Sequence, residues 1–225
     1  MIHLFALLSL LLCGVCYTGF QNSSHFHNTG NRRSLLLLVF GGALLLRLLL
    51  AYTTHGFSND IACFAAWADR IFTLGPGQFY SADMFTDYPP GFMYVLYLIG
   101  ALRSLLQIPY YSDLHILLLK LPAILCDIAC GFLLYREAVK RLHFSDLQGI
   151  FAASAYLFQP AVILNSSCWG QVDSVYTLMI ILMCLFLMKG NLLPAYAVYG
   201  LGVLLKPQML IFTPVLLAGI WDHVF

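Results

Sequence analysis

Long apolar stretches recur along this chain, and they constrain its fold more than any other feature of the sequence. An apolar helix needs about 20 residues to cross the roughly 30 Å hydrocarbon core of a bilayer, and fewer where it is re-entrant or packed inside protein. Only 9% of the 225 residues are charged and 61% are hydrophobic, whereas ordinary soluble domains carry about 25% charged residues. The sequence therefore predicts an all-α, polytopic integral membrane protein. The candidate membrane stretches are residues 1–17, 34–54, 91–106, 114–135, 147–164, 175–188, 192–205 and 209–221.

Clusters of Lys and Arg predict which ends of these stretches face the cytoplasm, because cytoplasmic loops carry an excess of positive residues. The clusters are Arg32 with Arg33, the group at 136–141, and Lys189. Segments 54–90 and 165–174 then lie on the opposite, outer face. Three apolar stretches separate these two outer segments, but two points on one face require an even number of crossings. We expect that the stretch at 91–106, which carries Arg103, is re-entrant or packed against the outer face.

The chain is thus expected to have two parts. Residues 1–33 form an N-terminal apolar segment and a cytoplasmic loop. The first stretch has the length of a signal-peptide core but lacks a cationic start and a cleavage site. Residues 34–225 form the transmembrane module. Its long outer loop contains apolar residues at helical spacing, which predicts an amphipathic helix on the membrane surface: Ile61, Phe64, Ala65, Ala68, Ile71 and Phe72.

Charge and cysteine usage exclude several classes of function. The net charge is +1, which provides no basic surface for nucleic acid. Cys13 and Cys16 lack a second pair of metal ligands, and the sequence indicates no metal site, although a divalent metal stays open. Cys63 and Cys168 lie near predicted loops on one face, so a disulfide between them is one hypothesis.

Asp60 stands at the start of the predicted surface helix. Its carboxylate could cap the helix by accepting from the exposed N–H groups of the first turn. Alternatively, it could act as a general base at the boundary of water and lipid, where a hydroxyl acceptor meets a lipid-borne donor.

The segment "NSSCWGQVDSVYTL" at 165–178 places Trp169, Gln171 and Asp173 at the outer start of a membrane stretch. Trp169 could be an interfacial anchor and Asp173 a helix cap. The same amide and carboxylate suit the binding of sugar hydroxyls, and a charge at a membrane boundary is costly unless it is paired or functional.

Two further interruptions of apolar sequence carry cations. In "LLKPQML", Pro207 breaks the helix, and Lys206 could either reach the interface or bind a phosphate. Arg47 could reach the interface, or pair with a carboxylate or a phosphate. Asp127 poses the same choice, and we favour a buried structural pair.

The stretch "FTDYPPGFMYVLYL" at 85–98 begins an apolar segment with Asp87, Tyr88 and two prolines. A proline disfavours helical geometry in the residue before it, so the prolines fix an extended turn that holds Asp87 at the outer face. A plain helix start, with a proline in its first turn and an aromatic anchor, is equally compatible.

Taken in order, Asp60, "FAAWA", "GPGQFY", "DYPPGFMY", "QPAVILNSSCWGQVDS" and "LKPQ" resemble the GT-C superfamily of polytopic glycosyltransferases, in particular bacterial proteins similar to GPI mannosyltransferase II. The resemblance covers residues 33–214 and implies a GT-C-like helical bundle. It also implies inverting transfer of a hexose, mannose in that subgroup, from a polyprenyl or dolichyl phosphate. The acceptor is a glycan, lipid or protein on the non-cytoplasmic face, which is the outer face of the plasma membrane in a bacterium.

The resemblance also assigns roles to residues. Asp60 is the expected catalytic base. Lys206 and, as a second cation, Arg47 bind the donor phosphate. A similarity in layout to the oligosaccharyltransferase catalytic subunit implies that Asp173 faces the same cavity as Asp60. The expected sugar or acceptor contacts are Trp169, Gln171, Asp173, Asp87, Tyr88 and Gln208. The lipid-linked sugar is a substrate, and no cofactor is expected.

Members of the superfamily are longer than this chain, so the resemblance implies an N-terminal part of a larger enzyme. Two other classes of function are open at this point. Charges inside a membrane and broken helices also mark transporters and flippases of lipids or sugars. A non-catalytic membrane fragment is the third reading.

Overall fold

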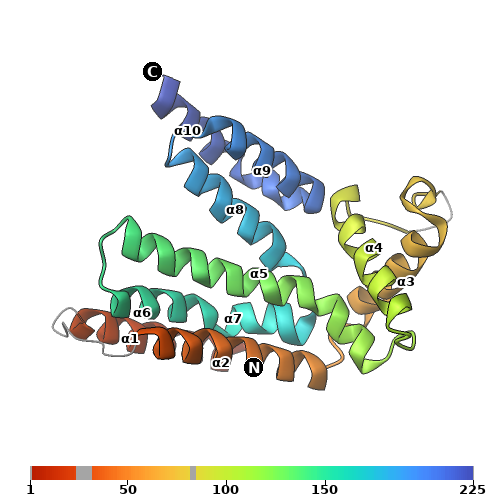
Figure 1. The fold of residues 1–225 in the computed structure, drawn as a ribbon, viewed down its shortest axis with the longest axis horizontal. Helices are drawn as coiled ribbons and strands as arrows, with labels where there is room; N and C mark the ends of the chain where they lie inside the picture. The colour runs from red at the N-terminus through yellow and green to blue at the C-terminus, as the bar shows by residue number, and fades with distance from the viewer. Residues whose placement is uncertain (1, 24–31, 82–84, 225) are drawn as a thin grey trace.

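The computed structural model of the chain describes residues 2–23, 32–81 and 85–224, and every regular element within these ranges is helical (Figure 1). This confirms the all-α prediction for the described residues. The predicted loop residues 24–31 lie outside them. The elements are α1 (Ile2–Ser23), α2 (Arg32–Thr53), α3 (Ser58–Leu74), η1 (Pro76–Gln78), α4 (Pro90–Leu105), α5 (Asp113–Lys140), α6 (Asp146–Leu157), α7 (Pro160–Ile163), the π-helical η2 (Leu164–Trp169), α8 (Asp173–Leu187), α9 (Leu192–Leu205), η3 (Pro207–Phe212) and α10 (Thr213–Val224).

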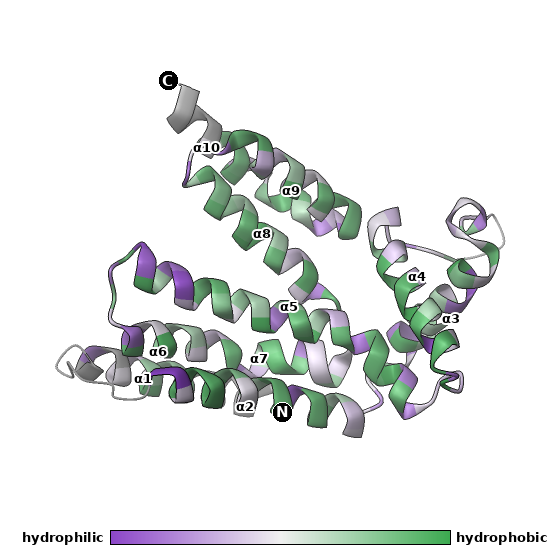
Figure 2. Cartoon of the chain, viewed as in Figure 1, coloured by the Kyte–Doolittle hydropathy of each residue, from purple (hydrophilic) through white to green (hydrophobic). Residues whose placement is uncertain are grey.

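Two of the described helices are long and apolar enough to cross a membrane. These are α2 with 22 residues and α5 with 28. Leucines at 37, 38, 45 and 49 of α2 are exposed, and apolar residues extend along most of α2, α8 and α9 (Figure 2). Exposed leucines along a helix of this length are typical of a surface that contacts lipid rather than water.

The predicted stretch 147–164 is not one straight helix. It divides into α6 and the α7–η2 segment, which meet at a bend of 51° and reach membrane length only when they are counted together. Gln159 is extended and Pro160 begins α7, since proline lacks the N–H that would continue the ladder of α6. The predicted stretches 175–188 and 192–205 form helices of only 15 and 14 residues, fewer than the roughly 20 that a straight crossing needs.

Helix α3 confirms the predicted amphipathic helix but not its predicted environment. Its apolar face is buried in a core that also contains Phe92 and Leu96 of α4 and Ile116 and Leu119 of α5. A Cβ atom on Gly100 of α4 would lie 2.5 Å from the carbonyl oxygen of Ala68, so the two helix backbones touch there. The apolar side of α3 therefore faces protein instead of a membrane surface.

Helix α4 begins at Pro90, which occupies the first helical position, where its missing N–H costs nothing. At its other end, Arg103 forms an ion pair with Asp69 of α3, which ties the two helices together. Figure 1 shows α3 and α4 side by side beyond the end of α2, with α4 running across α5 rather than along it. With 16 residues, α4 is about 24 Å long and is shorter than the hydrocarbon core.

A buried ion pair joins α2 to α5. Arg47 Nε donates to Asp127 Oδ2 at 3.2 Å, and both side chains are fully buried. Tyr156 of α6 donates to the other oxygen of Asp127 at 3.2 Å. Arg47 therefore pairs with a carboxylate instead of reaching the interface or a phosphate. The buried structural pair that we favoured for Asp127 is confirmed.

Lys120 of α5 caps the C-terminal end of α2, which the sequence did not predict. Its ammonium is fully buried and donates to the carbonyl oxygens of Ala51 at 3.2 Å and of Thr54 at 2.6 Å. The last carbonyls of a helix lack intrahelical partners and carry partial negative charge. Lys120 satisfies one of them, at Ala51, and binds the carbonyl of Thr54 just past the helix end, which fixes the point from which the chain continues to α3.

Candidate functional site

A cavity of about 510 Å³ lies between α3, the segment before α4, the turn after η2 and the turn after α9. These segments are far apart in the sequence, but the structure brings them to one place. The lining includes six of the nine residues that the sequence singled out: Asp60, Asp87, Tyr88, Gln171, Lys206 and Gln208.

Asp60 is held by two donors from the turn after η2. Its Oδ2 atom accepts from Trp169 Nε1 at 2.9 Å and from Gln171 Nε2. Helix α3 starts after Phe57 with no side-chain cap, so Asp60 is not the cap, although a carboxylate in the first turn is stabilised by the helix dipole. The Oδ1 atom makes no hydrogen bond to a described residue. It is therefore free to accept a hydrogen bond from a ligand.

Two glycines bring these segments into contact. Gly56 has φ +82°, and a Cβ atom there would lie 2.7 Å from the carbonyl oxygen of Trp169. Phe57 N donates to that same carbonyl at 2.8 Å. Gly170 has φ +88°, and its Cβ would lie 2.6 Å from Ile61. Only glycine combines a positive φ with so close an approach, so both positions are required to place Trp169 over the first turn of α3.

The π-helix η2 orients the turn at Gly170 and Gln171 that follows it. The sequence did not predict a π-helix here. Gly170 N and Gln171 N both donate to the carbonyl of Asn165, at 3.1 and 2.9 Å. The side chain of Asn165 donates to Asp173 Oδ2 at 2.9 Å. Single π-helical turns occur often at functional sites. The polar run "NSS" within an apolar stretch is the signal that could have indicated Asn165.

Gln171 links Asp60 to Tyr88. Its amide nitrogen donates to Asp60, and its amide oxygen accepts from the Tyr88 hydroxyl at 3.3 Å. This orientation of the amide satisfies both neighbours. Burial, together with the carboxylates of Asp173, Asp87 and Asp60, raises the pKa of Tyr88 above its usual value, so Tyr88 stays a hydrogen-bond donor.

Aromatic rings form one wall of the cavity. Tyr88 packs against Phe64 and Trp67 of α3, with ring centroids 5.6 and 5.8 Å apart. Trp67 Nε1 donates to the carbonyl of Phe85 at 3.1 Å, and the Tyr80 hydroxyl donates to the carbonyl of Tyr88 at 3.0 Å. These contacts hold the extended segment before α4 against α3, which gives the cavity a fixed, largely apolar side.

Lys206 supplies the cation. Helix α9 ends at Leu205, Lys206 is extended, and Pro207 begins η3, so the predicted break at "KPQ" is confirmed. The ammonium forms an ion pair with Asp173 and lies 5.7 Å from the ring centres of Tyr88 and Tyr176. A cation over aromatic faces is stabilised by the ring quadrupole.

Three of the predicted site residues do not line this cavity. Trp169 touches it only through Asp60. Asp173 pairs with Lys206 from outside the cavity. Together with Asn165 and Thr177, it lines a separate, smaller cavity of about 210 Å³. Arg47 is engaged with Asp127 in the core between α2 and α5, so the expectation that it binds the donor phosphate is wrong for this arrangement.

Two cysteines lie near the cavity or its neighbouring turn, and they are not joined to each other. Cys63 lines the cavity, and it is a free thiol, as is Cys168, so the disulfide hypothesis is wrong. Burial and the nearby carboxylates of Asp87 and Asp60 raise the pKa of Cys63.

Within the described ranges, no three His, Cys, Asp or Glu side chains gather as a metal site. The lining carries two carboxylates and one ammonium, so an anionic group binds most favourably beside Lys206.

Comparisons of the chain with protein-family models, with curated proteins and with solved structures find no match.

Proposed function

We propose that this chain is a membrane glycosyltransferase of the GT-C type, which transfers a hexose from a polyprenyl or dolichyl phosphate to a hydroxyl acceptor. One observation carries the proposal. A carboxylate with an open oxygen and a half-buried ammonium belong to one cavity, and Asp60 and Lys206 are linked through Gln171 and Tyr88.

Asp60 acts as the general base. Trp169 and Gln171 hold its Oδ2 atom, which leaves Oδ1 to take the proton of the acceptor hydroxyl. The acceptor oxygen then bonds to the anomeric carbon from the face opposite the phosphate. The bond from that carbon to the phosphate oxygen breaks, its electron pair leaves with the phosphate, and the configuration inverts. A positioned base of this kind contributes about 10²–10⁴ in rate.

Lys206 stabilises the departing phosphate. Its ammonium has three N–H groups, and one donates to Asp173. The others are left to donate to the phosphate oxygens as charge develops there, in a site where a placed cation is more effective than in water. Asp173 and the rings of Tyr88 and Tyr176 are positioning residues for this ammonium.

The remaining lining recognises the sugar and the acceptor. The rings of Phe64, Trp67 and Tyr88 offer an apolar wall against the C–H face of a hexose. Asp87 and Gln208 line the cavity from the segments before α4 and after α9. Their carboxylate and amide are suited to bind hydroxyl groups.

The proposed orientation places the site on the non-cytoplasmic side of a multi-pass protein. Helices α2 and α5 cross the membrane, and the basic residues at 136–141 face the cytoplasm. The α3–α4 pair lies at the opposite end of α5, where α4 covers the outer face without crossing. In this orientation two crossings, by α5 and by the bent α6–η2 segment, separate segments 54–90 and 165–174, which is the even number that two outer segments require.

The test uses the full chain, purified and reconstituted in proteoliposomes with a radiolabelled polyprenyl-phosphate hexose and candidate acceptors. The expected result is a covalently glycosylated acceptor and free polyprenyl phosphate. Movement of the labelled lipid or of free sugar across the bilayer, without any glycosylated product, would instead establish the transporter or flippase reading.

A further inference from the structure

A second cavity, of about 490 Å³, lies at the far end of α5 from the Asp60 site, and the proposed reaction does not use it. Its walls are the C-terminal turn of α5 and the turn that follows α8. Four of its six lining residues are cations and one is an acid: Arg136, Lys140, Arg141, Lys189 and Glu137, with Met188 as the sixth. Figure 2 shows the hydrophilic end of α5 in purple.

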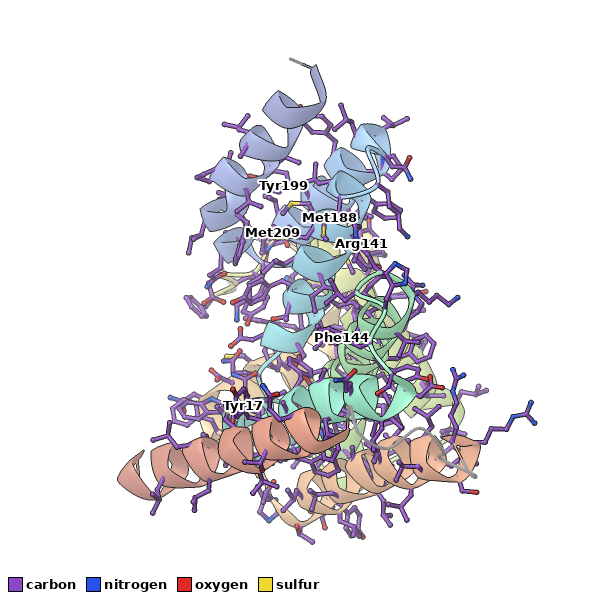
Figure 3. The ribbon with its side chains drawn as sticks, turned by 90° about the vertical axis from the view of Figure 1, so that its left-hand side faces the viewer. Tyr17, Arg141, Phe144, Met188, Tyr199 and Met209 are labelled. Atoms are coloured by element: carbon purple, nitrogen blue, oxygen red, sulfur yellow. The ribbon has the colours of Figure 1, made fainter. Side chains whose placement is uncertain are left out.

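The two walls are held together by a direct contact. Arg141 Nη2 donates to the carbonyl oxygen of Met188 at 2.8 Å, and Figure 3 shows these two residues side by side. Arg136 donates to Glu137 at 3.0 and 2.6 Å. The single carboxylate of the cavity is therefore already neutralised by its neighbour.

The two lysines are left to bind something else. Neither Lys140 nor Lys189 makes a side-chain hydrogen bond or ion pair with any residue in the described part of the chain. Both are exposed. A cavity with this excess of positive charge favours an anion, because each added cation attracts it and the acid does not oppose it.

The position of the cavity indicates the source of the anion. At 1.5 Å per residue, the 28-residue α5 is about 42 Å long, so its two ends reach opposite boundaries of a bilayer core of about 30 Å. Leu142 and Met188, which lie within two residues of the lysines in the sequence, are exposed by 57% and 52%, and Leu193 by 80%. Cations flanked by exposed apolar side chains match a phosphodiester headgroup with its acyl chains.

We propose that this cavity binds the headgroup of an anionic phospholipid in the leaflet opposite the Asp60 site, with Lys140 and Lys189 as the principal contacts. Basic pockets at the cytoplasmic ends of membrane helices bind such headgroups. The proposal shares with the proposed function only the orientation of α5 in the membrane, so sugar transfer and lipid binding can fail separately.

Native mass spectrometry of the full chain, released from mixed vesicles of phosphatidylglycerol and phosphatidylcholine, tests the proposal. The wild type should retain phosphatidylglycerol in preference. A Lys140→Gln/Lys189→Gln variant should bind it about 25-fold more weakly, since each lysine near an anionic surface strengthens binding about fivefold. A Lys140→Arg/Lys189→Arg variant should retain binding, which separates loss of charge from loss of folding.

Arg33→Gln is the matched control, because Arg33 is a cation expected on the same face but does not line the cavity. Its binding of phosphatidylglycerol should equal that of the wild type. An equal loss in Arg33→Gln would show diffuse attraction instead of a site. No preference over phosphatidylcholine, or displacement of the lipid by millimolar inorganic phosphate, would also overturn the proposal.

Discussion

Lys206 is the cation to which we assign the donor phosphate in the proposed site. It is the one positive side chain among the described residues that line the cavity. Its side chain is only 12% exposed. Water therefore could not easily take over its interaction with a bound anion if the lysine were removed. Asp173 keeps the ammonium in place without lining the cavity itself.

Replacing Lys206 should therefore reduce both the binding of the charged donor and the stabilisation of the departing phosphate. In Lys206→Gln, kcat/KM for the lipid-linked sugar should fall about tenfold or more, because a hydrogen bond to a charged group contributes about 1.5–3 kcal/mol. Lys206→Arg keeps the charge and should recover part of the loss. The measurement is the dependence of transfer rate on donor concentration, and an unchanged kcat/KM in Lys206→Gln would exclude this role.

Tyr88 gives the site a pH dependence that can be measured separately. Burial raises the pKa of its phenol, so its proton stays in place in the folded protein at a pH where a solvated tyrosine, with a pKa of about 10, ionises. The stabilisation by the protonated phenol is complete below that pH and is lost as the pH rises through the folded-state pKa.

Up to about pH 11, the folded wild type and Tyr88→Phe should show the same rise in tyrosinate absorbance. After denaturation at that pH, the wild type should exceed the variant by one tyrosinate. An excess of about one tyrosinate in the folded wild type at about pH 11 would show that Tyr88 is not buried as described.

At the scale of helices, a close backbone contact places the turn that carries Lys206. A Cβ atom on Gly91 would lie 2.6 Å from the carbonyl oxygen of Leu204. Helix α4 thus touches the last turn of α9, two residues before Lys206. Any added volume there must move backbone, because the atom that it meets is a carbonyl and not a flexible side chain.

Gly91→Ala should therefore displace Lys206 and reduce transfer by about 10–100-fold, since small misplacements of a catalytic group are costly. Gly42→Ala is the matched control, because nothing lies within 4 Å of a Cβ atom at this position of α2. The control should keep full activity, and alanine in place of glycine inside a helix stabilises it. Equal activity of the two variants would contradict the contact.

The ion pair of Arg47 and Asp127 ties α2 to α5, and its removal tests the fold rather than the site. Asp127→Leu leaves a buried guanidinium without its carboxylate, which should cost about 3–5 kcal/mol. Arg47→Leu/Asp127→Leu removes both charges and should be less destabilised than Asp127→Leu alone. Unfolding in detergent of the double variant and of the single variants Arg47→Leu and Asp127→Leu measures the coupling, and a double variant whose loss equals the sum of the two single losses would show that the charges do not interact.

Local pattern predicted most of the helices but few of their partners. The spacing of Ile61, Phe64 and Ala68 indicated α3 because helical periodicity is visible within a few residues. The sequence could not show that this face packs on α4, because an apolar face looks the same toward lipid and toward protein. Lys120 was missed because its acceptor at Thr54 lies 66 residues away.

The residues of the candidate site were easier to predict from the sequence than these contacts between helices. Asp60, Gln171 and Lys206 interrupt apolar sequence, where polar groups are costly unless they are used. The sequence could not reveal that Asp173 holds Lys206 from behind. The bend at Pro160 was missed although the proline indicates it. The π-helical turn after it could not be predicted, because it depends on backbone geometry and not on periodicity.

At the scale of the whole molecule, the two cavities mark opposite ends of α5. The Asp60 cavity adjoins the core that contains Ile116 and Leu119, near the start of α5. The cationic cavity lies at its C-terminal turn. A helix of about 42 Å separates them, so the proposed orientation assigns transfer to one membrane face and lipid binding to the other.

The most direct test of the central claim is the rate of sugar transfer by Asp60→Asn together with its affinity for the donor. The variant should bind the polyprenyl-phosphate hexose as the wild type does and transfer it about 10²–10⁴-fold more slowly. Asp113→Asn changes another first-turn carboxylate, on α5 outside the cavity, and should transfer at the wild-type rate. A wild-type rate in Asp60→Asn would contradict the account.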